Sequence, residues 1–345
     1  MRILLCSSYV PFVNGGARFI VDWTHKVLQE HGHDVEIVNL PFSDEPQEIL
    51  SQMMAYRLLD LSEYADRIVT FRPPAHVIPH PHKIIWFIHH IRVFYDMWDT
   101  EHRSVENNPR GRALRDRLHD FDRHALLEAK SLFTNSRIVG DRLRKFNGIS
   151  SVPLYPPIFQ PERFSNLGYS DEISYVSRVE PHKRQHLLVE ALRYCKSKVC
   201  IGIYGTSQQT DYPSFIRELI AKYGLADRVN FQCRWISEAE KEKIIGRALA
   251  VAYLPEDEDS YGYPSLEGAH SQKPILTTTD SGGVLEFVVD DENGAIPSPD
   301  PRAIAEAMDA FYLNRRKTER QGKAAELKIG ELNITWHHVV ESLTS

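Results

Sequence analysis

Hydrophobic and polar positions in the first half of the chain alternate between short apolar runs and amphipathic segments. Apolar residues recur at helical spacing from Phe19 to Val27, and Gly32 ends that segment. A second segment, with Ser136 as its cap and Gly148 after its end, also predicts a helix. The apolar runs suit strands buried in a parallel sheet: "RILLCSS", "DVEIVNL", "RIVTF", "KIIWFIHH" and "SLFTNS".

The alternation stops at a group of prolines and then starts again. Pro153, Pro156, Pro157 and Pro161 predict a linker, because proline suits neither a helix interior nor a sheet interior. We therefore predict two domains and a final helix that packs back on the first domain: residues 1–158, residues 159–330, and residues 331–345.

The second half repeats the β/α pattern. Ser237 and Glu240 form a capping box, and Asp300 precedes Pro301 as a cap with proline at the first helical position. The strand-like runs are "EISYVSRV", "VCIGIYG", "RVNFQC", "LAVAYLP", "PILTTT" and "VLEFVV". Two successive alternations predict an α/β fold with two Rossmann-like, doubly wound parallel-sheet domains. Such sheets bind ligands at the carboxyl ends of their strands, and two facing domains would hold a ligand in the cleft between them.

Composition narrows the class of protein. The chain has 345 residues and a net charge of −6, which argues against a general nucleic-acid binder. Its four cysteines are widely spread and suggest no disulfide framework or zinc site, so we expect a reducing cytoplasm. The start "MRILLCSSYVPF" predicts a first strand and not a signal peptide, and no run is long enough to span a bilayer. Peripheral contact with a membrane surface stays open, as does the oligomeric state.

The stretch "EDEDSYGYPSLEG", residues 256–268, combines charge with a turn and a helix start. It follows the predicted strand "LAVAYLP", Gly262 allows a tight turn, and Pro264 suits a first helical turn. The free amides of that turn attract phosphate. Asp259 could then reach a sugar and Glu267 a pair of ribose hydroxyls, since a carboxylate only accepts hydrogen bonds. A solvated acidic loop before a surface helix is the alternative.

Several segments together resemble a known family. "DSYGYPSLEG" resembles the Glu-x7-Glu segment of retaining glycosyltransferases of family 4, which have the GT-B fold. "SRVEPHKRQHLLVEAL" is similar to the family segment that ends in Arg-x4-Lys, and "TTTDSGGVLEFVVDDENGAI" to its Gly-Gly-x-x-Glu segment. "LFTNSRIVGDRLRKF" and the Gly15-Gly16 turn also fit, so the resemblance spans most of the chain in the family's order.

The resemblance implies a role for each matching residue. Arg178 and Lys183 would neutralise the diphosphate as the glycosidic bond breaks, with Arg184 as an adjacent substitute for Lys183. His89 would contact the transferred sugar. The first acid of the segment would be Asp259 by spacing, or Glu258 if one residue is inserted.

Further residues complete the predicted site. The predicted donor-binding residues besides these are Gly15, Gly16, Tyr261, Gly262, Tyr263, Pro264, Ser265 and Glu267. The predicted sugar or acceptor contacts are His90, Arg92, Gly282, Gly283 and Glu286. On their own, such glycines are also what a plain loop contains.

Metal sites are not favoured. "EDED" could be an Asp-x-Asp metal motif of the GT-A fold, but it stands late in the chain, in a domain that has basic phosphate partners. His76, His80 and His82 lie among prolines with no acid close by in sequence. We predict no metal and no cofactor beyond the nucleoside-diphosphate sugar as co-substrate.

The sequence therefore predicts a retaining glycosyltransferase of glycan or glycoconjugate biosynthesis. It would move a sugar from a nucleoside-diphosphate sugar to a hydroxyl acceptor, which could be a glycan, a lipid-linked glycan, a protein or a small molecule. A nucleotide-sugar epimerase and a non-catalytic nucleotide-sugar sensor are the alternatives. A nicotinamide dehydrogenase lacks support, because no G-x-G-x-x-G follows the first strand.

Overall fold

The chain forms two compact units. Unit 1 comprises Met1–Pro156 and Thr335–Ser345, and unit 2 comprises Pro157–Ile334. The polypeptide thus leaves unit 1 once and returns to it with its last helix. The computed structural model describes residues 1–9, 16–43, 45–100 and 103–345.

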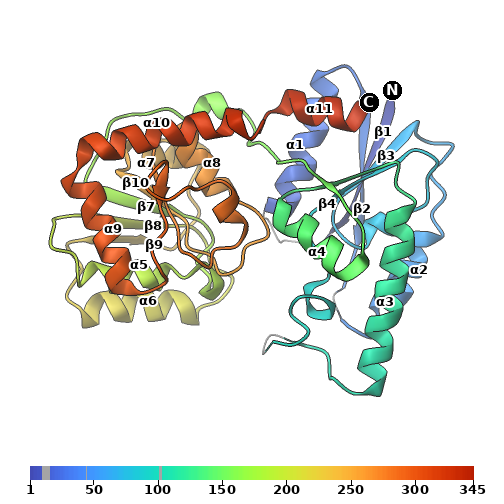
Figure 1. Ribbon diagram of the computed structural model, residues 1–345, viewed down its shortest axis with the longest axis horizontal. Coiled ribbons are helices and arrows are strands. Elements are labelled where there is room, and N and C mark those ends of the chain that lie inside the picture. Colours follow the sequence, from blue (N-terminus) through green and yellow to red (C-terminus); the bar gives the residue numbers. More distant parts are fainter. Residues whose placement is uncertain (10–15, 44, 101–102) are drawn as a thin grey trace. The chain divides into compact units, whose positions relative to one another are not determined.

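A parallel sheet forms the centre of unit 1. Its described strands have the order β2-β1-β3-β4-β5-β6, and every adjacent pair is parallel (Figure 1). Every residue of β4 is buried, as expected for a parallel strand covered on both faces. The strands are β1 (Arg2–Tyr9), β2 (Asp34–Pro41), β3 (Arg67–Thr70), β4 (Lys83–Phe87), β5 (Ser131–Thr134) and β6 (Val152–Pro153).

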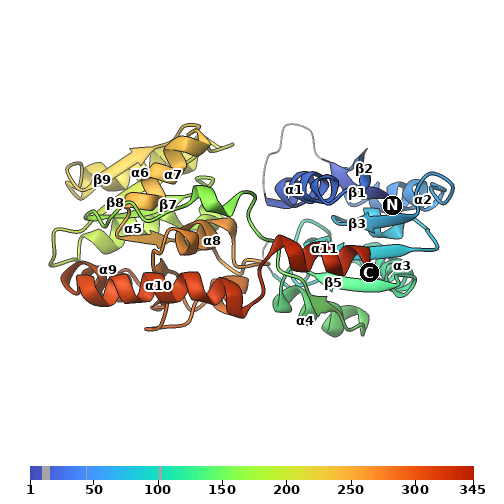
Figure 2. The ribbon, with the colours of Figure 1, turned by 90° about the horizontal axis from the view of Figure 1, so that it is seen from above.

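Capping residues set the ends of helix α4 in unit 1. The Ser136 hydroxyl accepts a hydrogen bond from the Val139 amide at the start of α4, and Gly148 ends this helix with a φ of 67°. The last helix, α11, lies beside α1 (Figure 2), and the Arg67 guanidinium donates to the Leu343 carbonyl at 2.6 Å. The helices are α1 (Gly16–Glu30), α2 (Ile49–Arg57), α3 (Pro109–Leu127), α4 (Arg137–Asn147), α11 (Trp336–Thr344) and the 3-10 turns η1 (Ala75–Val77) and η2 (Arg92–Phe94).

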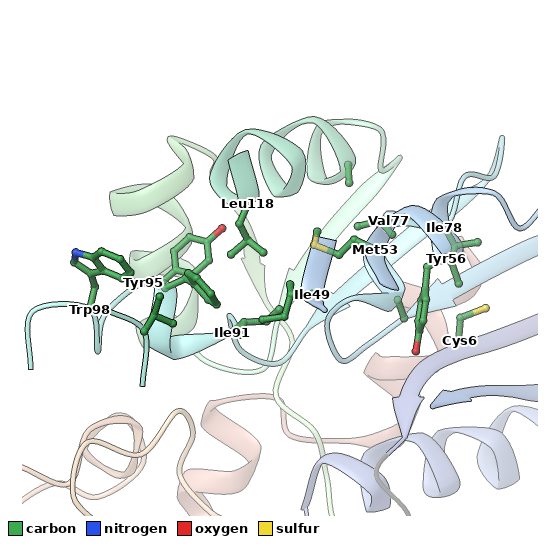
Figure 3. Packing of buried hydrophobic residues seen from close by; sticks show 14 of the residues in the cluster. Cys6, Ile49, Met53, Tyr56, Val77, Ile78, Ile91, Tyr95, Trp98 and Leu118 are labelled. Carbon is green, nitrogen blue, oxygen red and sulfur yellow. The ribbon is translucent and has the colours of Figure 1, made fainter. Parts of the chain in front are cut away.

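The larger core cluster of unit 1 joins its sheet to α2, α3 and the segment after β4. Cys6 from β1, Met53 from α2, Leu118 from α3 and Tyr95 from the segment after β4 belong to it (Figure 3). Each fully buried aliphatic or aromatic side chain contributes about 1.5–3 kcal/mol. This packing holds the segment that follows β4 against the sheet.

Unit 2 repeats the architecture. Its described strands have the order β12-β11-β10-β7-β8-β9, again with parallel pairing throughout. The chain builds outward from β7 to β9 and then from β10 to β12, so the direction of winding reverses between β7 and β10. The strands are β7 (Glu172–Val176), β8 (Cys200–Tyr204), β9 (Val229–Gln232), β10 (Ala250–Ala252), β11 (Ile275–Leu276) and β12 (Gly294–Ala295).

Helices cover both faces of this second sheet. In Figure 1, α5, α6 and α9 lie on one face and α7, α8 and α10 on the other, in agreement with the contacts of α5 with α9 and of α8 with α10. The structure confirms two Rossmann-like parallel-sheet domains. The helices are α5 (Gln185–Leu192), α6 (Asp211–Lys222), α7 (Glu238–Arg247), α8 (Tyr263–His270), α9 (Pro301–Leu313), α10 (Arg315–Glu331) and the 3-10 turns η3 (Pro161–Arg163), η4 (Pro181–Lys183) and η5 (Gly283–Glu286).

In this unit, the predicted helix caps are correct and one predicted strand is wrong. Ser237 caps α7, and Asp300 caps α9 through two amides. The run "VLEFVV" is not a strand, because η5 occupies its beginning after Gly282 turns the chain with a φ of 62°. Among the described residues, no helix is both long enough and apolar enough to cross a membrane.

Candidate functional site

The acidic stretch lies where the sequence predicts it, after a strand and before a helix. Strand β10 ends at Ala252, and α8 starts at Tyr263 with Pro264 in its first turn. Gly262 has a φ of 70°, and a Cβ at this position would lie 2.1 Å from Cε1 of Tyr253. Both its backbone conformation and its close neighbour therefore require glycine.

Three side chains form a polar cluster at this end of the sheet, and we call them the Lys183 cluster. Lys183, from η4, pairs its ammonium with the Glu258 carboxylate and donates to the Tyr253 hydroxyl at 2.9 Å. The Tyr253 hydroxyl also lies 2.8 Å from Oε2 of Glu258. Segments that follow β7 and β10 thus meet through charged and polar groups.

The electrostatics of the cluster favour an ionised carboxylate. Burial opposes ionisation of Glu258, but the Lys183 ammonium and the Tyr253 hydroxyl outweigh it and hold the pKa of Glu258 below its usual value. Burial and the nearby Glu258 charge raise the pKa of Tyr253 far above its usual value. At neutral pH Glu258 is therefore a carboxylate and Tyr253 a neutral hydroxyl.

The cluster occupies the topological switch point of unit 2. Its members come from the segments after β7 and after β10, the two neighbouring strands between which the winding reverses. In open α/β sheets, ligands bind outside the carboxyl ends of the strands at such a point. The geometry of the sheet therefore makes this end the candidate ligand site.

The two arginines near Lys183 differ in their surroundings. Arg178 is exposed, and within the part of the chain that the structure describes its guanidinium forms no hydrogen bond or ion pair. Arg184 is buried and donates to both carboxylate oxygens of Asp280, at 2.7 and 2.8 Å, and to the Leu254 carbonyl at 2.8 Å. Arg184 thus supports the loop after β10, and its guanidinium is not placed to substitute for Lys183.

Glu267 lies one turn inside α8, as the sequence predicts. Its carboxylate is buried and bonds through Oε1 to the Lys241 ammonium of α7 at 2.6 Å. Lys241 also contacts Glu238 at 3.0 Å. Burial raises the pKa of Glu267, and the Lys241 ammonium partly offsets that rise.

The glycine turn near Glu286 lies against the acidic loop. The Gly283 amide donates to the Glu258 carbonyl at 2.7 Å, and Gly282 forms an isolated bridge with Glu258. A Cβ on Gly282 would lie 2.5 Å from that carbonyl, so the close approach requires glycine. The structure thus brings the Gly282-Gly283 turn to Glu258, and Glu286 lies half-buried at the end of η5.

The two candidate acids occupy neighbouring positions in the loop. Glu258 contacts Lys183, whereas the sequence spacing favours Asp259, which is half-buried. Nearby, Tyr261 and Ser265 are buried, and Tyr263 and Pro264 are half-buried. The role of each as a donor-binding residue stays a prediction.

The predicted residues of unit 1 fall into three settings. His89, after β4, is half-buried and its Nδ1 lies 2.7 Å from the His90 carbonyl oxygen. Arg92 pairs with Asp96 at 2.6 Å. Gly16 is the first residue of α1, and Gly15 lies outside the described residues.

His90 belongs to a buried network that sequence reasoning missed, which we call the Asp122 network. Asp122 contacts Nε2 of His76 at 2.8 Å and the Tyr95 hydroxyl at 2.5 Å. Asn147 joins it, with its Oδ1 2.9 Å from Nε2 of His90. Burial lowers the pKa of His90 to about 4, so this ring is neutral and its position favours a structural role. Only contacts between distant segments reveal this network, and local sequence carries no signal for it.

The histidines among the prolines have separate partners. Besides His76 in the Asp122 network, the His80 ring lies 3.2 Å from the Ala65 carbonyl oxygen. Within the residues that the structure describes, no group of three or more His, Cys, Asp or Glu side chains is arranged to hold a metal ion.

Comparison with known structures defines the class. Over the whole of both chains, the fold matches that of the Anabaena protein Alr3699/HepE in complex with UDP, with a TM-score of 0.71 and 17% identity. Two Rossmann-like domains with this match define the GT-B fold of glycosyltransferases. Residues 162–328 match the family of glycosyl transferases group 1. The matched segment covers just under half of the chain and lies within unit 2.

Curated relatives match only part of this chain. The α-1,3/1,6-mannosyltransferase ALG2 of Dictyostelium discoideum is 28% identical over 122 residues, which cover 34% of this chain and 28% of that protein. The lipopolysaccharide core biosynthesis mannosyltransferase LpsB of Rhizobium meliloti is 28% identical over 180 residues, which cover 49% of this chain and 50% of that protein. The chain thus spans half or less of the length of these curated relatives.

Proposed function

We propose that this chain transfers a sugar, with retention of anomeric configuration, from a nucleoside-diphosphate sugar to an acceptor hydroxyl. The observation that carries the proposal is the Lys183 cluster at the switch point of unit 2, where Lys183 and Glu258 meet beside the start of α8. A structurally similar protein was solved with UDP, which supports a nucleotide ligand.

The diphosphate of the donor is the natural partner for the cations and amides. The Lys183 ammonium and the exposed Arg178 guanidinium would neutralise its charge, which grows as the glycosidic bond breaks. The amides at the start of α8, which lie at the positive end of the helix dipole, would add to this attraction. Each charge-assisted contact contributes about 1.5–3 kcal/mol.

Carboxylates would recognise the hydroxyl groups of the donor. Glu267 has one carboxylate oxygen bonded to Lys241, and its second oxygen would accept from the ribose. Asp259 or Glu258 would accept from hydroxyls of the transferred sugar, beside the Gly282-Gly283 turn. In unit 1, His89 and Arg92 would contact sugar or acceptor.

A panel of donors tests the proposal. Purified protein would be incubated with UDP-, GDP-, dTDP- and ADP-linked sugars and a set of hydroxyl acceptors, with and without a chelator. We expect acceptor-dependent release of one nucleoside diphosphate and a product that keeps the donor's anomeric configuration by NMR. Activity with the chelator would support a metal-independent reaction. Donor isomerisation without an acceptor, or tight binding without turnover, would contradict the proposal and favour an epimerase or a sensor.

A further inference from the structure

Tyr253 is held tightly at the carboxyl end of β10. Its side chain is buried, and its ring meets that of Tyr175 edge to face, with the ring centroids 6.1 Å apart. Gly262 lies against the Cδ1, Cε1 and Cζ atoms of the Tyr253 ring. The Tyr175 hydroxyl contacts the Lys183 carbonyl and accepts from the Leu254 amide, at 2.5 and 3.0 Å. The Tyr253 ring is therefore packed between Tyr175 and Gly262 of the acidic stretch.

The chemistry of the three partners fixes the direction of each hydrogen bond. A lysine ammonium can only donate and an ionised carboxylate can only accept. Since Lys183 donates to the Tyr253 oxygen, the single hydroxyl proton of Tyr253 is left for Glu258, 2.8 Å away. Tyr253 is thus the only neutral group of the cluster, and it binds both charged ones.

We propose that Tyr253 is a positioning residue of the donor site, which holds Lys183 toward the diphosphate and keeps Glu258 in place when the diphosphate attracts Lys183. This inference rests on the proposed function. Without the hydroxyl, Glu258 would have Lys183 as its main partner in the cluster, and a shift of Lys183 toward phosphate would leave the carboxylate unsupported. With the Tyr253 hydroxyl present, its hydrogen bond to Glu258 remains when Lys183 moves.

The charges around Glu258 give the inference a pH signature. Lys183 and His182 face it from η4, Tyr253 faces it from the residue after β10, and Arg178 acts on the same cluster from the segment after β7. Loss of the Tyr253 hydroxyl removes a donor to the carboxylate, so the pKa of Glu258 rises toward its ordinary value. If turnover needs ionised Glu258, the acid limb of the pH–rate profile moves to higher pH.

The test compares Tyr253→Phe with Tyr204→Phe in the full chain. Tyr204 is the matched control, because its hydroxyl also bonds a glutamate, Glu172 at 2.9 Å, and none of its partners belongs to the proposed site. For Tyr253→Phe we expect kcat about tenfold lower, a donor KM changed by about threefold or less, and an acid limb at higher pH. Tyr204→Phe should keep the wild-type kcat and acid limb.

A second readout needs no turnover. The lowered pKa of Glu258 stabilises the fold above the ordinary carboxyl pKa, and this stability is lost as pH falls through the lowered value. The rise in melting temperature from acidic to neutral pH should therefore be smaller for Tyr253→Phe than for wild type. An unchanged gain, or an equal loss in Tyr204→Phe, would overturn the inference.

Two further outcomes separate the inference from the proposed function. If Tyr253→Phe does not fold, Glu258→Gln replaces it, and a wild-type acid limb in that variant overturns the role of Glu258 and hence of Tyr253. If wild type transfers no sugar from any donor, the proposed function fails, and the melting-temperature series alone decides whether Tyr253 supports Glu258.

Discussion

Two buried polar clusters, the Asp122 network of unit 1 and the Lys183 cluster of unit 2, differ in charge and exposure. The Asp122 network of unit 1 surrounds one carboxylate with histidine, tyrosine and asparagine side chains, all of them at most 2% exposed. The Lys183 cluster of unit 2 pairs an ammonium with a carboxylate, and the Glu258 side chain is 24% exposed. One cluster is closed within a core, and the other opens at a sheet end.

This difference suits the Asp122 network to supporting the fold and the Lys183 cluster to binding a ligand. In the Asp122 network, α3, α4 and the segment after β4 are joined by bonds that an outside ligand cannot reach. These bonds hold the segment after β4, to which His89 and Arg92 also belong. In the Lys183 cluster, the proposed function requires the ammonium to exchange part of its carboxylate contact for an anionic ligand.

The largest expected effect comes from removing the cation of the Lys183 cluster. Lys183→Ala should lower kcat about 100- to 1000-fold, because a diphosphate leaving group loses its main charge partner. The melting temperature should fall by only a few degrees, since water reaches Glu258. Steady-state assays and thermal unfolding measure both, with exposed Lys198→Ala as the control. Unaltered rates would remove Lys183 from the site.

The matching change in the Asp122 network should act on stability. Burial opposes ionisation of Asp122, but the His76 ring and the Tyr95 hydroxyl outweigh it and lower its pKa. Asp122→Asn should reduce the free energy of unfolding by about 2–4 kcal/mol, by breaking a buried network.

The pH dependence provides the control for this second prediction. The lowered pKa makes ionised Asp122 stabilising at neutral pH, and the stability is lost as pH falls through the lowered value. The loss in Asp122→Asn should therefore be larger at neutral than at acidic pH in denaturant titrations. Nucleoside-diphosphate affinity should not change, and a large drop in affinity would contradict the division between the two clusters.

Removing Glu267 tests the second carboxylate of unit 2. Glu267→Ala should weaken nucleoside-diphosphate binding about tenfold, which corresponds to one lost hydrogen-bonding group for the ribose. Calorimetry measures the change, and exposed Glu292→Ala is the control. An affinity equal to that of wild type would show that the ribose does not contact Glu267.

The smallest expected effect compares helix caps. Ser136→Ala at the start of α4 should lower the free energy of unfolding by about 1 kcal/mol, and Ser237→Ala at the start of α7 by a similar amount. Neither cap belongs to a polar cluster, so both variants should keep the wild-type kcat. A loss of turnover in Ser237→Ala would show that α7 positions Glu267 through Lys241 more strictly than a helix cap requires.

Local features of the fold could be predicted because local chemistry determines them. Ser136, Gly148, Ser237 and Asp300 end or begin helices as expected, since caps depend on residues three or four positions apart. The run "VLEFVV" was wrongly predicted to be a strand. Its first residues belong to the 3-10 turn η5. Hydrophobicity alone cannot tell these apart.

The site could be predicted only in part. The start of α8 and the place of Glu267 follow from Gly262 and Pro264, which act within a few residues. The partners do not: Lys183 and Glu258 are 75 residues apart, and Lys241 and Glu267 are 26 apart. Such pairs depend on sheet topology, so a charged residue in the sequence reveals a candidate but not the group that neutralises it.

The return of the chain to unit 1 has a practical consequence for labelling and proteolysis. Met1 and Ser345 belong to the same unit, and unit 2 is bounded by two crossings, at 156–157 and 334–335. Fluorophores on the two ends would thus report on unit 1 alone, and a sensor of interdomain movement needs one dye inside unit 2. A single backbone cut at either crossing would leave unit 2 covalently joined to one part of unit 1 through the other crossing, so releasing unit 2 as a fragment takes two cuts.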